Sequence, residues 1–148
     1  GGHLASTIST HDTDLSNIND EIDSQIFTPN FMILVSPVIS LGNYTHKGSL
    51  KFLLGDHATS ENILKYSNEF HVTENTPPTL LFHAQNDPAV NPMNSMLFYT
   101  EMMKHGVKGS LHIFPKGKHS IGIYNESSLT DEWKTICTKW LKEIEIIK

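Results

Sequence analysis

Three short apolar segments, each about as long as a typical β-strand, constrain the fold of this chain most strongly. They cover residues 31–35, 79–84 and 110–114 of a 148-residue sequence. The first two lack polar alternation, which favours strands that are buried on both faces of a sheet. The third alternates more, from Ser110 to Phe114, and fits a position nearer a sheet edge.

Segments with helical patterns separate these strands, whereas residues 11–30 are polar and indicate a loop. Two short helices are expected over residues 3–10 and over 50–54, the second ended by Gly55. A third should run from a Ser60 cap to Tyr66, and a fourth from an Asn91 cap and Pro92 to just before Gly106. The last should run from about Asp131 to Ile144. The fourth helix should carry Met96, Tyr99, Met102 and Met103 on one face. Strands that alternate with helices imply right-handed crossovers, so the fold class is α/β with a parallel sheet.

Charge and composition exclude several classes of partner. The net charge is -5, and all 11 basic residues are lysines. Arginine is the side chain that best binds phosphate through two parallel hydrogen bonds, but its absence can also reflect codon usage. The negative net charge and the missing basic patch are the stronger evidence against nucleic acid. We therefore expect no nucleic-acid partner. No segment approaches the ~20 apolar residues of a membrane helix, and no membrane partner is expected. The single cysteine, Cys137, excludes an internal disulfide and is expected to be a buried small hydrophobe.

Two titratable residues follow the second and third predicted strands. Asp87 comes shortly after residues 79–84, and His119 follows residues 110–114. Ligands of open α/β sheets bind at the carboxyl ends of the strands, where both residues would meet. An acid and then a histidine is the order of the last two members of a hydrolase triad. Taken singly, Asp87 is also typical of a turn before proline, and His119 of a surface loop. Together they favour the catalytic interpretation.

The sequence contains no Gly-x-Ser-x-Gly elbow to supply the nucleophile of such a triad. Four other serines are poor substitutes because none has elbow surroundings: Ser6, Ser36, Ser95 and Ser120. His3 and His83 are interpreted as structural histidines near a site.

The chain begins Gly1-Gly2-His3-Leu4-Ala5, which resembles the segment directly after the nucleophile in α/β-hydrolase esterases, where the elbow reads Gly-x-Ser-Ala-Gly-Gly-His-Leu-Ala. The resemblance continues through residues 36–40, 45–49, 53–55, 66–69, 76–79 and 112–117. The sequence is similar to a bacterial group of acetyl xylan esterase-like, feruloyl esterase-like and lipase-like enzymes. It departs from that group at Asn91, where proline is frequent, and at Lys118 and Ser120, where glycines are common.

This resemblance implies that residues 1–148 are the C-terminal half of one α/β-hydrolase domain, with about three of its strands. Asp87 takes the acid position and His119 the histidine position, without metal or organic cofactor. The serine and both oxyanion-hole donors would lie in the other half. The substrate would be a small ester or an acylated carbohydrate, and the compartment stays open. Residues 41–58 either line the substrate pocket or merely connect elements.

Two functions remain open from the sequence. In the first, the chain is a fragment of a serine carboxylic-ester hydrolase and is inactive by itself because it lacks the nucleophile. In the second, it is a catalytically inactive remnant or excised domain that only folds and self-associates. An apolar strand without a neighbour on one side invites pairing with another chain. In either case we therefore expect self-association, through the edge of the strand Phe31–Val35 or by exchange of a segment between chains.

Overall fold

The computed structural model describes residues 1–11, 21, 25–123, 125 and 127–148; most of the loop predicted over residues 11–30 lies outside the described residues. The helices are α1 (Gly2–Thr10), α2 (Lys47–Leu54), α3 (Ser60–Lys65), α4 (Met93–Lys104), α5 (Ser128–Asp131) and α6 (Trp133–Glu143), with 3-10 turns η1 (Gly55–His57) and η2 (Asn68–His71). The strands are β1 (Met32–Val35), β2 (Thr79–Ala84) and β3 (Gly109–Phe114). All three predicted strands are therefore confirmed.

The strands form one parallel sheet in the order β1-β2-β3. Met32 is in register with Thr79, and Thr79 is in register with Gly109. Every residue of β2 is buried, as its unbroken apolar run predicts, and β3 lies at one edge. The predicted α/β class with a parallel sheet is confirmed.

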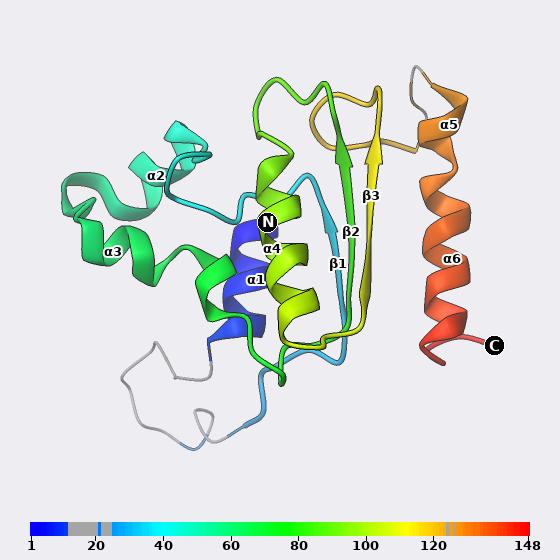
Figure 1. The fold of residues 1–148 in the computed structure, drawn as a ribbon, viewed down its shortest axis with the longest axis horizontal. Helices are drawn as coiled ribbons and strands as arrows, with labels where there is room; N and C mark the ends of the chain where they lie inside the picture. Colours follow the sequence, from blue (N-terminus) through cyan, green and yellow to red (C-terminus); the bar gives the residue numbers. More distant parts are fainter. Residues whose placement is uncertain (12–20, 22–24, 124, 126) are drawn as a thin grey trace.

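Helices cover both faces of the sheet, which gives three layers (Figure 1). On one face, α1 and α4 pack against Met32, Leu34 and Leu81, with Phe98 and Met102 of α4 fully buried. On the other face, α6 lies against Leu80, Phe82 and Phe114 and buries Trp140. Successive side chains of a strand point to opposite faces, so the apolar strands supply both cores.

Helix α1 begins beside the carboxyl end of β1 (Figure 1). A Cβ at Gly2 would lie 2.8 Å from both the Cα and the Cβ of Pro37, so only glycine permits this approach. The close packing directs the start of α1 toward the loops that follow the strands.

Several predicted helix details are wrong. Helix α3 is capped by the Thr59 hydroxyl rather than by Ser60. Helix α4 begins at Met93, one residue later than expected, although the Asn91 side chain still accepts from the Met93 N–H. The last helix is split, since Ser128–Asp131 forms its own turn before Trp133.

The predicted apolar face of α4 is right at Tyr99 and Met102, which pack in the core, and wrong at Met96 and Met103. Met96 and Met103 are exposed, whereas Asn94 and Ser95 are fully buried with Phe98 and Met102. The side chains of Asn94 and Ser95 face inward because they make the hydrogen bonds described below. A prediction from hydropathy alone does not include such bonds. Cys137 packs on the α6 core but is only half-buried. Burial raises the pKa of its thiol.

No helix in the described part of the chain is long and apolar enough to span a bilayer. On its outer side β1 has no neighbouring strand among the described residues. Met32 and Ser36 donate their N–H groups to Pro78 and Phe82 on the inner side. Because backbone groups alternate along a strand, those of Ile33 and Val35 face the open edge.

Candidate active site

The predicted acid is held in the loop that follows β2. The Asp87 side chain is fully buried, and its Oδ1 atom accepts from the N–H groups of Ala89 (2.9 Å) and Val90 (3.0 Å). Such side-chain-to-backbone bonds two and three residues ahead are typical of aspartate turns. The turn predicted by the Asp-Pro pair therefore exists, and it fixes the direction in which the second carboxylate oxygen points.

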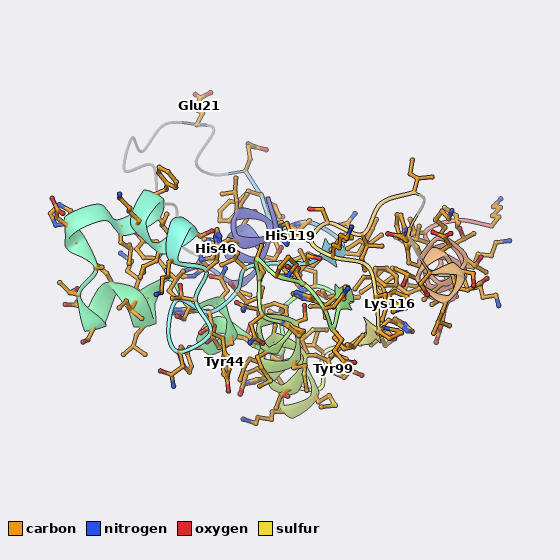
Figure 2. All side chains as sticks on the ribbon, turned by 90° about the horizontal axis from the view of Figure 1, so that it is seen from above. Glu21, Tyr44, His46, Tyr99, Lys116 and His119 are labelled. Atoms are coloured by element: carbon orange, nitrogen blue, oxygen red, sulfur yellow. The ribbon has the colours of Figure 1, made fainter. Side chains whose placement is uncertain are left out.

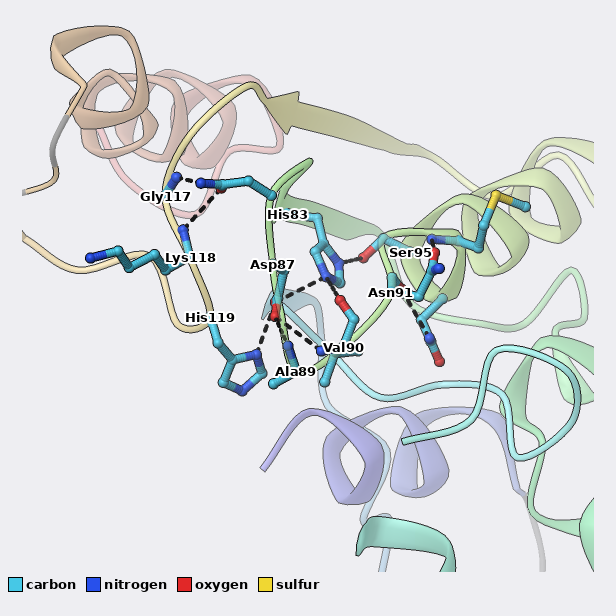
Figure 3. A network of polar contacts seen from close by, with 12 residues as sticks. His83, Asp87, Ala89, Val90, Asn91, Ser95, Gly117, Lys118 and His119 are labelled. Atoms are coloured by element: carbon cyan, nitrogen blue, oxygen red, sulfur yellow. Dashed lines mark hydrogen bonds and ion pairs between the residues drawn. The ribbon is translucent and has the colours of Figure 1, made fainter. Parts of the chain in front are cut away.

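That second oxygen faces the predicted histidine. Asp87 Oδ2 lies 2.9 Å from Nδ1 of His119, which comes from the loop after β3 (Figure 3). A carboxylate only accepts, so Nδ1 carries the proton and Nε2 keeps its lone pair. The His119 side chain is 41% exposed. It lies near the middle of the face onto which the strands' carboxyl ends open (Figure 2). The structure thus brings Asp87 and His119 together, in an arrangement that suits a general base at Nε2.

A side chain that the sequence did not single out joins the two loops. Asn86 Oδ1 accepts from the N–H groups of Gly117 (3.0 Å) and Lys118 (3.2 Å). The backbone adds a bond from Gln85 N–H to the Phe114 carbonyl. The Asn86 contacts join the acid loop to the histidine loop within two residues of both catalytic candidates. No local sequence pattern announces them, because they depend on the pairing of β2 with β3.

His119 lies between two residues in left-handed backbone conformation. Lys118 has a φ of 55° and Ser120 a φ of 58°. Such angles disfavour side chains other than glycine. Lys118 and Ser120 therefore add backbone strain on both sides of His119.

His83 is a second, fully buried partner of the acid. Its Nε2 atom lies 2.9 Å from the Val90 carbonyl and 3.3 Å from Asp87 Oδ2. The carbonyl only accepts, so Nε2 carries the proton and Nδ1 accepts from the Ser95 hydroxyl at 2.8 Å (Figure 3). His83 is therefore the structural histidine that the sequence predicted. His3 is likewise hydrogen-bonded, to the Tyr66 carbonyl.

Burial and hydrogen bonding act in opposite directions on the acid. Desolvation by itself would raise the pKa of Asp87. The Val90 N–H, the His119 ring and the Ala89 N–H outweigh it, so the net pKa lies below its usual value. Burial also lowers the pKa of His83, despite its contacts with Val90 and Asp87. The carboxylate is thus charged and His83 neutral at pH 7.

Acid should destabilise the fold through these groups. The folded pKa values of four histidines are lowered, chiefly by burial: His3, His11, His83 and His112. As pH falls below about 6.5, the unfolded chain takes up protons that the folded chain does not, so stability is lost. The lowered pKa of Asp87 adds a further loss near and below pH 4. We expect the free energy of unfolding, from urea titrations, to fall between pH 7 and pH 5. The fall should be shallower in His83→Gln, whereas a flat profile would contradict this account.

The candidate serines are not positioned by a hydrogen bond to the histidine base. Ser6 and Ser95 are fully buried, and Ser36 is buried directly after β1. Ser95 contacts His83 rather than His119, and Ser6 bonds within α1. Ser120 is exposed but adjacent to His119 in the chain. Among the described residues no serine hydroxyl is hydrogen-bonded to His119, and no group of three His, Cys, Asp or Glu side chains could hold a metal ion.

Comparison with known proteins identifies one matching family and two similar curated proteins. The profile of the prolyl oligopeptidase family matches residues 31–145. The chain is 32% identical over 149 residues to an acetylxylan esterase of Xylanibacter ruminicola, covering 97% of this chain and 29% of that protein. It is also 32% identical over 126 residues to endo-1,4-beta-xylanase B of Butyrivibrio fibrisolvens, covering 85% of this chain and 20% of that protein.

Solved structures match nearly the whole chain. An acetyl ester-xyloside bifunctional hydrolase from Caldicellulosiruptor lactoaceticus shares 38% identity with a TM-score of 0.89, over 99% of this chain and 54% of that one. The carboxylesterase Cest-2923 from Lactobacillus plantarum shares the fold, at 20% identity and a TM-score of 0.76, over 100% of this chain and 57% of that one. The chain therefore spans about half the length of these solved relatives and less than a third of the curated ones.

Proposed function

Because the chain belongs to the prolyl oligopeptidase family of α/β-hydrolases, we propose that it supplies the acid and the histidine of a serine esterase triad. The observation that carries the proposal is the 2.9 Å hydrogen bond from His119 Nδ1 to the buried Asp87 carboxylate, which leaves Nε2 free to act as a base. Relatives named acetylxylan esterase and acetyl ester-xyloside hydrolase support ester hydrolysis rather than another reaction of the family.

The proposed reaction has two halves. His119 Nε2 takes the proton of a serine hydroxyl as the serine oxygen attacks the ester carbonyl. The imidazolium then gives that proton to the departing alcohol, leaving an acyl-serine. In the second half a water molecule attacks the acyl group, losing a proton to Nε2, and the serine recovers one as the acid departs. Asp87 holds the ring and stabilises its charged form throughout. The serine and the oxyanion-hole donors come from outside the described residues.

The proposed substrate is a small ester or an acylated carbohydrate. The support is the printed activity of two relatives, whose names join acetyl esters to xylan or xylosides. Since a fold by itself does not fix a substrate, this choice needs its own test.

A hybrid enzyme tests the proposal directly. This chain would replace the matching 54% of the Caldicellulosiruptor lactoaceticus hydrolase, which supplies the rest of the domain. We expect the hybrid to hydrolyse p-nitrophenyl acetate, whereas the chain by itself should show negligible turnover. A folded hybrid without esterase activity would count against the proposal. So would activity of the isolated chain that a serine-directed inhibitor abolishes.

The open edge of β1 favours a second candidate function, in which the chain is not catalytic and associates with a second copy. A hollow of about 320 Å³ runs along this edge, lined by apolar side chains that include Ile8, Phe27, Phe31 and Ile33. Ile8 is 39% exposed and Phe27 46% exposed. An unpaired strand beside exposed apolar side chains is a template for pairing between chains.

We therefore expect self-association through this edge. Light scattering after size exclusion should give a mass above that of one chain, and the mass should rise with protein concentration. Ile8→Lys should shift the chain toward monomer, because a buried lysine in the contact is unfavourable. Leu64→Lys is the matched control, since Leu64 lies on α3 and is also exposed. A compact monomer at all concentrations would refute this prediction.

A further inference from the structure

A polar hollow of about 340 Å³ lies next to the acid loop and is not used by the chemistry described so far. One wall is the loop before α2, with Asn43, Tyr44 and Thr45, and the other is the loop between β2 and α4, with Gln85 and Asn91. Asp87 also lines it. A molecule in the hollow would therefore lie beside the loop that holds the acid, whose side chain is bonded to His119. The volume falls in the range of small-molecule sites.

The hollow is preformed, because a single buried side chain holds its two walls together. Asn94 of α4 is fully buried, and its Oδ1 accepts from the N–H groups of Ile39 and Ser40, both at 2.9 Å. Its Nδ2 donates to the carbonyls of Tyr44 (2.9 Å) and Asn91 (3.0 Å). Both atoms of the carboxamide are thus fully used, and the Tyr44 backbone is fixed relative to Asn91.

The chemistry of the walls indicates a neutral ligand. Asp87 is the charged residue of the lining, but its side chain is fully buried, with Oδ1 occupied by Ala89 and Val90 and Oδ2 by His119. Asn43 and Gln85 are exposed and carry amide groups that both donate and accept. Tyr44 adds an aromatic side chain that is 38% exposed. Amides that bind hydroxyls, beside a ring that packs on C–H groups, match a molecule with many hydroxyls and no charge.

We propose that this hollow binds the sugar part of an acylated carbohydrate, with Tyr44, Asn43 and Gln85 as its recognition residues. The inference rests on the proposed function, because it concerns the alcohol side of the same ester. A peptide would find no carboxylate or cation in the walls to pair with its charged ends, since Asp87 is already committed. The sugar is therefore favoured over a peptide substrate, although the family is named for oligopeptidases.

Binding to the intact 148-residue chain tests this without any turnover. Xylobiose would be titrated into isotope-labelled chain and followed by NMR. We expect saturable shifts confined to residues 43–45 and 85–92. Tyr44→Ala should weaken binding about tenfold, whereas Tyr44→Phe, which keeps the ring, should change it little. Gln85→Ala should weaken it less. Asn75→Ala is the matched control, because Asn75 is exposed and lies in a different hollow.

The outcomes separate this inference from the proposed function. Saturable sugar binding that survives His119→Ala, in a chain whose hybrid is inactive, would support the subsite while overturning the esterase. An active hybrid whose chain shows no saturable shifts with xylobiose would overturn the subsite alone. Equal losses in Tyr44→Ala and Asn75→Ala would also overturn it. Binding of a proline-containing dipeptide with both termini blocked at residues 43–45, in place of the sugar, would overturn it as well.

Discussion

Replacing His119 by alanine should lower kcat/KM of the hybrid esterase for p-nitrophenyl acetate by about 10³–10⁴-fold, because the serine then loses its general base. The nearby His83 cannot take over this role. It is fully buried, and its proton is bound between the Val90 carbonyl and Asp87. The effect should appear in kcat rather than in KM, since His119 acts in the transition state and not in ground-state binding.

Asp87→Asn should lower kcat/KM of the hybrid esterase by a similar factor, for a different reason. The amide presents either an oxygen or an N–H group to Nδ1, and it carries no charge to stabilise the imidazolium. His105→Ala is the matched control, because His105 is an exposed histidine directly after the last residue of α4. Activity of His119→Ala or Asp87→Asn within a few-fold of the unmodified hybrid would refute their assignment. Circular dichroism would confirm that each variant is folded.

Asn94→Leu should lower the free energy of unfolding of the chain by about 3–5 kcal/mol. Leucine has a similar shape, but it removes the four hydrogen bonds that the carboxamide makes to Ile39, Ser40, Tyr44 and Asn91. Backbone N–H and C=O groups that lose their partners while still shielded from water each cost about 1–3 kcal/mol. Partial access of water to the Tyr44 turn keeps the total below the sum of the four.

Urea unfolding measures this loss as a lower midpoint at constant slope. Asn75→Leu is the matched control, since it makes the same chemical change at an exposed site and should alter stability by less than about 0.5 kcal/mol. A change below about 1 kcal/mol in Asn94→Leu would mean that the two walls of the hollow are held by other contacts. A folded Asn94→Leu chain should also bind xylobiose more weakly, because Tyr44 is no longer fixed.

The strands and most helices could be predicted because their signals are local. The apolar runs at 31–35 and 79–84 form β1 and β2 as predicted, although β1 is fully buried only at alternate residues, and the helices end at Gly55 and Gly106 as expected. The buried face of α4 could not be predicted in the same way. Asn94 and Ser95 look like surface residues until the loop at residue 39 and the ring of His83 supply their partners.

The candidate site shows the same division. Asp87 and His119 could be found because chain order and strand ends are visible in the sequence, and the structure brings them into contact. The supporting side chains were missed or only partly understood. Asn86 accepts hydrogen bonds from two N–H groups that lie more than 30 residues further along the chain. His83 meets Ser95 because of the face of β2 on which it lies. Such partners arise from tertiary pairing, for which a single sequence carries no local signal.

The bridge made by the Asn86 side chain has a consequence for motion. Because it binds the backbone of the histidine loop beside His119, the two loops are expected to move as one unit when the edge of the sheet fluctuates. Thermal displacement of one loop then carries the other with it, so the separation of acid and base should vary less than the position of either. An insertion in one loop alone would therefore change the separation of Asp87 and His119. A graft that carries both loops together would preserve that separation.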